Sequence, residues 1–161
     1  MINSSINKEK YHLAQINIAQ ARDEMDTITM KGFVGRLDEI NALAEASDGF
    51  VWRLQTEEGD ATSIQAFDDP SLIVNMSVWR DIDSLKNYVY KSMHVELIRD
   101  RDAWFSKIQN VHQTLWWVPA GCVPTVEEGK EKLALLEAHG ATNNTFTFAK
   151  SFPQPAPVGT V

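Results

Sequence analysis

At 161 residues, with 43% hydrophobic and 23% charged residues, the chain has the size and composition of a single globular domain. Its net charge of −7 argues against a nucleic-acid partner, because phosphates are bound by a basic protein face. A single cysteine, Cys122, excludes an internal disulfide and a thiolate metal cage, and no stretch has the apolar length of a signal peptide or membrane span. We therefore expect a cytoplasmic protein with no metal site.

The first half of the chain predicts a strand, a helix and a second strand. In residues 12–19 the side chains alternate with the period of two that is typical of a strand. Residues 30–46 carry apolar side chains at helical spacing, and Gly49 follows as a signal for the end of the helix. Residues 50–56 are rich in β-forming side chains and predict the second strand. The apolar stripe of the helix consists of Phe33, Leu37, Ile40 and Ala44.

The second half repeats this order of elements. Residues 72–79 alternate as a third strand, and Asp81 is a candidate N-cap for the helix that follows. Ser92 is a candidate cap for a second helical piece. Residues 113–119 predict a fourth strand, which ends at its proline.

The C-terminal part predicts one more helix and a tail. Thr125 and Glu128 have the spacing of a capping box, which opens a helix that runs to about His139. Residues 145–148 indicate a short edge strand, and the proline-rich residues 149–161 are expected to be disordered. We therefore expect one domain over residues 11–148.

Two strand–helix–strand units predict an α+β fold of the ferredoxin-like type. In this split βαβ sandwich an antiparallel sheet carries its helices on one face. The second face of the sheet is then uncovered, and a second copy of the chain is the usual cover for such a face. We therefore expect a homodimer.

Strand alternation decides which side chains share a face of this sheet. We expect Ile16, Val74 and Met76 to pack under the helices, and we assign Arg53 of the second strand to the opposite, open face. The polar neighbours of the apolar residues would then also line the open face. They are Gln15, Asn17, Asn75 and Ser77.

One of two adjacent tryptophans must also lie on the open face. Because neighbours on a strand point to opposite sides, one of Trp116 and Trp117 belongs to the core and the other to the open face. Amides, a hydroxyl, an arginine and an indole on one surface indicate either a small-molecule pocket or a wet dimer interface.

His94 has two interpretations. It can be a packed or surface histidine, or it can be an acid–base group, because imidazole changes its charge near neutral pH. Tyr90 is close enough in the sequence to act in the same region as a hydrogen-bond donor. The sequence contains none of the motifs G-x-G-x-x-G, H-E-x-x-H and G-x-S-x-G, which argues against nucleotide-dependent, zinc-protease and serine-hydrolase functions.

Several stretches of the sequence are similar to those of a known family: LAQINIA, GFVGRLDEINALAEASDGFVWRL, NMSVWRDIDSLKNYVYKSMHVEL, DAWF and LWWVPAGCVPTVEEGKEKL. Through these stretches, residues 12–148 resemble DUF3291, a bacterial family of uncharacterised proteins. It implies membership in the dimeric α/β-barrel group, with antibiotic-biosynthesis and haem-degrading monooxygenases as distant relatives. Monooxygenases of that group often carry H-x-x-S-x-H near the end of the second helix, and Val89, Ser92 and His94 correspond to it here. Because Val89 stands in the usual region of the haem ligand, the resemblance argues against haem, and we expect no cofactor.

We therefore expect a homodimer whose pocket binds a flat, partly aromatic small molecule. One hypothesis is a cofactor-independent monooxygenase-like or isomerase-like enzyme, with His94 as the base and with Asn17 and Asn75 holding an oxyanion or carbonyl. Trp104 and Trp116 would then form the wall of the pocket. The other candidate ligand contacts are Ser77, Arg53 and Tyr90. The alternatives are a ligand-binding module without catalysis and a structural dimer with no pocket.

Overall fold

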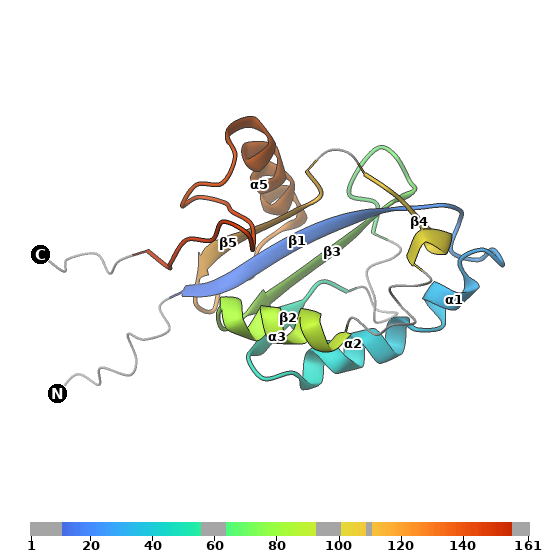
Figure 1. Ribbon diagram of the computed structural model, residues 1–161, viewed down its shortest axis with the longest axis horizontal. Coiled ribbons are helices and arrows are strands. Elements are labelled where there is room, and N and C mark those ends of the chain that lie inside the picture. Colours follow the sequence, from blue (N-terminus) through green and yellow to red (C-terminus); the bar gives the residue numbers. More distant parts are fainter. Residues whose placement is uncertain (1–10, 56–63, 93–100, 109–110, 156–161) are drawn as a thin grey trace, which may run out of the picture.

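The computed structural model describes residues 11–55, 64–92, 101–108 and 111–155. Five strands and four labelled helices lie in these ranges, and residues 101–104 are also helical (Figure 1). The strands are β1 (Tyr11–Ala21), β2 (Phe50–Arg53), β3 (Leu72–Trp79), β4 (Phe105–Ser106) and β5 (Gln113–Pro119). The helices are α1 (Lys31–Val34), α2 (Leu37–Ala46), α3 (Ile82–Ser92) and α5 (Val126–His139).

The strands form one antiparallel sheet with the ferredoxin-like order. β3 lies between β2 and β1, and both β4 and β5 pair with β1. On β1, the residues from Tyr11 to Asn17 pair with β5, and Gln20 and Ala21 pair with β4. The predicted α+β fold with a split βαβ arrangement is therefore confirmed.

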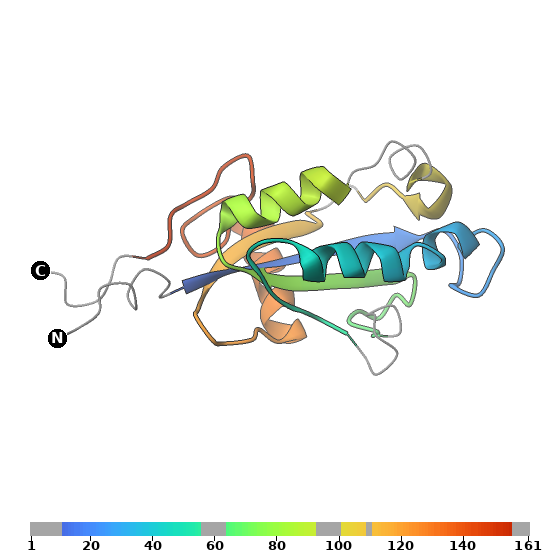
Figure 2. The same cartoon turned by 90° about the horizontal axis from the view of Figure 1, so that it is seen from below.

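Helices cover both faces of the sheet. α2 and α3 lie together on one face, and α5 lies on the other (Figures 1 and 2). The helices of the two strand–helix–strand units therefore share one face as expected, but the expectation that the second face is uncovered is wrong: the C-terminal helix returns across it and packs against β1 and β5.

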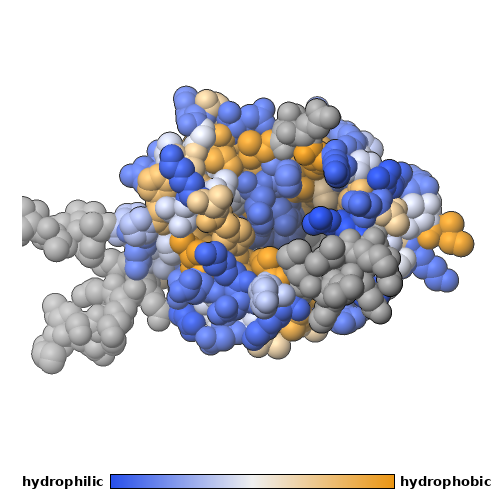
Figure 3. Space-filling view, viewed as in Figure 1, coloured by the Kyte–Doolittle hydropathy of each residue, from blue (hydrophilic) through white to orange (hydrophobic). Residues whose placement is uncertain are grey.

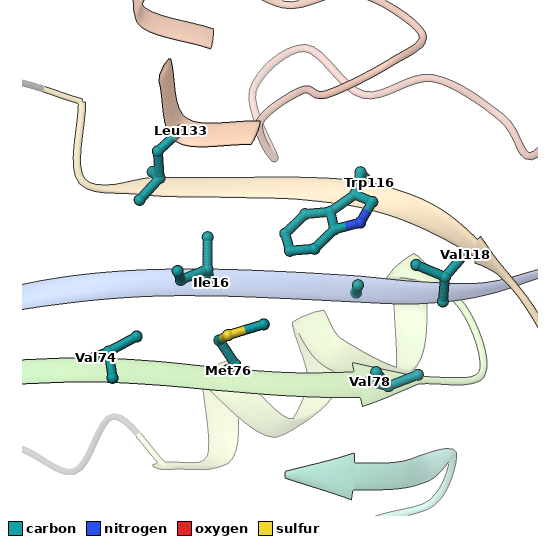
Figure 4. Packing of buried hydrophobic residues seen from close by; sticks show 8 residues of the cluster. Ile16, Val74, Met76, Val78, Trp116, Val118 and Leu133 are labelled. Carbon is teal, nitrogen blue, oxygen red and sulfur yellow. The ribbon is translucent and has the colours of Figure 1, made fainter. Parts of the chain in front are cut away.

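The assignment of the two sheet faces is reversed relative to the sequence-based expectation. Ile16, Val74 and Met76 do not pack under α2 and α3; they face α5, where they form a core with Trp116 and Leu133 (Figure 4). The polar side chains between them on β1 and β3 face α2 and α3 instead. Alternation had grouped the side chains correctly, but it does not say which layer covers which group.

α5 packs closely on the apolar face because it carries a glycine at the contact. A Cβ on Gly129 would lie 2.8 Å from Cδ1 of Ile16, so a larger residue would push the helix away from the sheet. The helix begins where the capping box predicted it, since Oγ1 of Thr125 accepts a hydrogen bond of 3.1 Å from the amide of Glu128.

Two apolar clusters hold α1, α2 and α3 to the other face. The first cluster lies towards the start of β1 and contains Leu13, Ala44, Trp79, Leu85 and Leu115. The second lies towards the end of β1 and contains Ala21, Met30 and Trp104, with Phe33 packed against it. The polar middle of the sheet is thus flanked at both ends by packed apolar side chains.

Three local predictions need correction. The helix expected over residues 30–46 is interrupted at Gly35 and Arg36, which separate α1 from α2. Residues 145–148 form no full strand, and only Phe146 bridges to Leu115 of β5. In the tail expected to be disordered, Phe152 packs against Phe146 and its carbonyl accepts a hydrogen bond from Nε1 of Trp117, so residues 149–155 belong to the folded part.

The N-terminus of α3 and the turn at Gly49 that packs against it agree with the sequence pattern. Oδ1 of Asp81 accepts hydrogen bonds of 2.8 Å from both the amide and the hydroxyl of Ser84, which confirms the predicted N-cap. Gly49, between α2 and β2, has a φ of 87°, and a Cβ there would overlap the side chain of Ser84. Only glycine fits this turn without strain.

Candidate functional site

A cavity of about 350 Å³ lies between the sheet and the α2–α3 layer. Its volume is at the lower end of the range for ligand pockets. Polar side chains of the sheet line one side of it: Asn17, Arg53, Asn75 and Gln113. Apolar and aromatic side chains complete the lining, among them Phe33, Leu37, Ile40, Tyr88 and Phe105.

Two asparagines form the centre of the polar side. Asn17 of β1 and Asn75 of β3 are directly paired across the antiparallel ladder, so their side chains leave the same face of the sheet side by side. Both line the cavity, and Asn75 is exposed to it. The pairing brings together two residues that are 58 positions apart, by their numbers, in the chain.

A buried glutamine orients Asn75. Nε2 of Gln15, a residue that is 3% exposed, donates to Oδ1 of Asn75 at 2.7 Å and to Oγ of Ser77 at 2.9 Å. Nε1 of Trp79 donates to the same hydroxyl at 2.8 Å. Because the carbonyl oxygen of Asn75 is engaged, its NH₂ group is left to donate to a ligand. Ser77 is therefore part of the support of the site and does not line the cavity.

Arg53 supplies a cation at the β2 side of the cavity. Its side chain is 12% exposed, and its Nε donates to Oε2 of Glu45 at 2.8 Å. An irregularity in the β2–β3 pairing between Phe50 and Trp52 places Phe50 and Arg53 on the same side of the sheet. The guanidinium has five N–H donors, so the bond to Glu45 leaves others for a ligand oxygen.

The aromatic wall differs from the one expected. Tyr90 is 86% exposed and points away from the cavity, whereas Tyr88 lines it, stacks on Trp79 with centroids 5.0 Å apart and donates to the carbonyl of Ile40. Two positions along a helix are about 200° apart around its axis, so Tyr88 and Tyr90 cannot both face the sheet.

Neither expected tryptophan lines the cavity. Trp104 is buried in the second apolar cluster, where it supports Phe33, and Phe105 reaches the cavity in its place. Trp116 is on the α5 face, with its Nε1 donating to Oε2 of Glu128 at 2.8 Å. Trp117 faces the same side of the sheet as α2 and α3, but it packs in the first apolar cluster, beside Phe146.

His94 lies outside the described residues, so its role stays a prediction. The other histidines are placed. His139 ends α5 as expected, His12 lies in β1, and His112 is exposed next to the start of β5. In the part of the chain that the structure describes, no group of three or more His, Cys, Asp or Glu side chains is arranged to hold a metal ion. No helix in that part has the length and apolar character needed to cross a membrane.

Sequence reasoning missed several lining residues and found others indirectly. Leu37 and Ile40 belong to the predicted apolar stripe of the helix, and that stripe indeed faces the cavity. Gln113 and Phe105 carried no local signal, because each reaches the cavity only through the pairing of its strand with β1.

Solved structures with a similar fold are distant in sequence. They include a protein of unknown function from Nitrosomonas europaea (13% identity, TM-score 0.45, covering 73% of this chain and 96% of that one). A protein from Pseudomonas aeruginosa has 14% identity and a TM-score of 0.45, covering 71% of this chain and 98% of that one. SnoaB, a cofactor-independent oxygenase from Streptomyces nogalater, has 14% identity and a TM-score of 0.40, covering 71% of this chain and 98% of that one. Similarity at this level establishes no activity for this chain.

No curated protein matches the chain significantly. The model of one family does match, and it spans residues 12–158. The stretches that carried the resemblance in the sequence lie within this range and supply both the cross-strand asparagine pair and the helix stripe that faces it. The chain therefore belongs to DUF3291, a family described as a domain of unknown function.

Proposed function

We propose that the cavity binds a flat, partly aromatic small molecule and stabilises negative charge that develops on one of its oxygen atoms. The observation that carries this proposal is the paired Asn17 and Asn75, with Gln15 holding the NH₂ group of Asn75 towards the cavity. Fixed amide donors aimed at a developing oxyanion are a large source of rate enhancement in enzymes. Arg53, which is ion-paired with Glu45, offers its remaining N–H donors, and Phe33, Tyr88 and Phe105 supply faces for a flat ligand.

The reaction that fits this arrangement begins at a carbon next to a carbonyl group. A base removes a proton from that carbon, and the electron pair of the C–H bond moves to the carbonyl oxygen as an enolate held by the asparagines. His94 is our proposed base. Return of the proton to another carbon gives an isomerase.

Oxygen can take the place of that proton. The enolate carbon then passes two electrons to O₂, a C–O bond forms and one proton completes the hydroperoxide. Loss of water breaks the O–O bond, so that a CH₂ group and O₂ become a C=O group and H₂O. The substrate supplies all the electrons, so this proposed chemistry requires no cofactor.

Dithranol, a flat ketone with an acidic CH₂ group, is a suitable probe. With the wild-type protein we expect oxygen uptake above the uncatalysed rate and formation of the corresponding quinone, followed by oxygen electrode and mass spectrometry. Asn75→Ala should lower the rate by about 100-fold, the usual loss when one oxyanion donor is removed. Asn87→Ala, on the exposed side of α3, is the matched control and should keep the wild-type rate. Equal rates in the wild type and Asn75→Ala would contradict the proposed oxygenase.

A ligand-binding module is the second candidate, and the exposure of Asn75 favours it. Reactive enolates are usually protected from water, and more than a third of the Asn75 surface is open to solvent. Binding of dithranol that depends on Asn75, without oxygen uptake or proton exchange, would support this candidate. A homodimer with no ligand is the remaining alternative.

We also propose that the chain is a homodimer, with a single domain that starts at residue 11 and extends beyond the expected end at residue 148 to residue 155. α5 covers only part of the apolar sheet face, and beside it lies a groove of about 690 Å³ whose apolar lining includes Ile18, Phe67, Leu72 and Leu133. A second copy packed there would remove this surface from water. A cytoplasmic location is a further proposal, supported by Cys122, which is exposed and in no disulfide.

A further inference from the structure

The edge of the sheet is interrupted next to the asparagine pair. The pairing of β1 with β5 ends at Asn17 and Gln113, and its pairing with β4 begins at Gln20 and Ser106. A second cavity, of about 510 Å³, lies at this interruption. It is lined by residues from both sides of the break, including Ser106, Lys107 and His112.

The two cavities adjoin each other. Four residues line both of them: Asn17, Ala19, Phe105 and Gln113. A ligand oxygen held by Asn17 can therefore belong to a molecule that extends from the α2–α3 side into the break. The surface in Figure 3 has a hollow near its middle, with hydrophilic atoms inside and hydrophobic atoms along its border.

The cavity at the break has the opposite charge balance to the whole chain. Arg101 and Lys107 line it together with one carboxylate, Asp102, whereas the chain as a whole carries −7. Neither Arg101 nor Lys107 forms an ion pair with a described residue. Arg22 approaches the same segment, since its Nε donates to the carbonyl oxygen of Asp102. Cations that line a cavity in an acidic protein raise the local concentration of anions.

We propose that the substrate is a flat aromatic carboxylate, whose carboxylate is bound at the break by Arg101 and Lys107. This inference rests on the proposed function, because the oxygen at the other end of the molecule is the one held by Asn17 and Asn75. The carboxylate accepts hydrogen bonds from the two cations, and the aromatic rings lie beside Phe105, which lines both cavities. The protein thereby selects acids over neutral molecules of the same shape.

Three probes of one shape test the inference: 2-naphthol, 6-hydroxy-2-naphthamide and 6-hydroxy-2-naphthoate. Calorimetry should show that the carboxylate binds about tenfold more tightly than the amide, the gain expected from two exposed charge pairs. In the double variant Arg101→Gln/Lys107→Gln this advantage should disappear, while 2-naphthol binds as before. Raising the ionic strength from about 0.01 M to about 0.15 M shortens the Debye length from roughly 30 Å to roughly 8 Å. This change should weaken the binding of the carboxylate and leave the binding of the other two probes unchanged.

The control variant Lys86→Gln/Lys150→Gln removes the same total charge from exposed positions outside both cavities and should keep the preference. A carboxylate that binds no better than the amide, or a preference that survives Arg101→Gln/Lys107→Gln, would overturn the inference and leave the proposed function intact. Failure of all three probes to bind, or binding unaffected by Asn75→Ala, would overturn both. The two failures are therefore distinguishable.

Discussion

At the scale of single residues, the site depends on a buried glutamine that does not itself line the cavity. Gln15 bonds both Asn75 and Ser77, and it lies opposite Ser77 in the β1–β3 register. Gln15→Met keeps the volume of the side chain but removes the donor of both bonds. Oγ of Ser77 keeps its bond from Nε1 of Trp79, and Asn75 is exposed to solvent. We therefore expect the free energy of unfolding to fall by about 1 kcal/mol, the usual net contribution of a hydrogen bond.

Gln15→Met should also weaken ligand binding, because Asn75 is then free to turn its carbonyl towards the cavity. Urea denaturation and calorimetry with 2-naphthol measure the two effects. The exposed Gln65→Met is the control, and its change in stability should stay within about 0.5 kcal/mol. Wild-type affinity in Gln15→Met would show that Asn75 needs no support.

Trp104 acts at the same scale, as a core residue behind the cavity wall. It is 7% exposed, its ring is 5.9 Å from that of Phe33, and Gly32 packs directly on its indole. Trp104→Ala should lower the free energy of unfolding by about 3–5 kcal/mol, as for other buried aromatic side chains. Trp52→Ala, which removes a partly buried ring on the opposite face, should cost less. Equal denaturation midpoints for Trp104→Ala and the wild type would refute the core role.

At the scale of elements, α3 is held at its N-terminus by Asp81. Burial raises the pKa of Asp81, but the hydrogen bonds from Ser84 and the charge of Arg80 outweigh it, so the pKa lies below its ordinary value. A carboxyl group whose pKa is lower in the folded state stabilises the fold above its unfolded pKa of about 3.9. That stabilisation is lost as the pH falls through the folded pKa.

We therefore expect the wild type to lose stability below about pH 4, with part of this loss absent in Asp81→Asn. Asparagine is also a good N-cap, so the variant removes the titration and keeps the cap. Urea midpoints between pH 2 and pH 6 measure the difference. Some acid sensitivity should remain, because hydrogen bonds from Arg80 and Ser71 also lower the pKa values of Asp48 and Asp69, respectively. Parallel curves for the two proteins would contradict the role of the Asp81 charge.

At the scale of the whole molecule, the groove beside α5 is the surface that we expect a second copy to cover. Sedimentation at micromolar concentration should give twice the mass of one chain. Ala134→Arg places a long cation on the exposed groove lining and should yield monomers without unfolding, whereas Ala42→Arg on the exposed side of α2 should leave the dimer intact. A monomeric wild type would refute the proposed dimer. A dimeric Ala134→Arg variant would show that the interface does not lie at this groove.

Much of the fold could be predicted from the sequence because the signals are local. The bounds of β3 and β5, the caps formed by Asp81 and Thr125, and the end of α5 at His139 all depend on neighbouring residues. Alternation along β1 and β3 also grouped the polar side chains on one face before any pairing was known.

Only the tertiary structure decided what covers each face and which side chains meet there. A strand pattern is unchanged when the two faces are exchanged, so it could not tell that α5 would cover Ile16 and Met76 while α2 and α3 cover the asparagines. The same reason explains why Tyr88 lines the cavity and Tyr90 does not: helical spacing defines stripes, and packing selects the stripe that is buried. The sequence by itself determined the helices and strands and which of their side chains share a face. Long-range packing determined which of these faces come together to form the cavity.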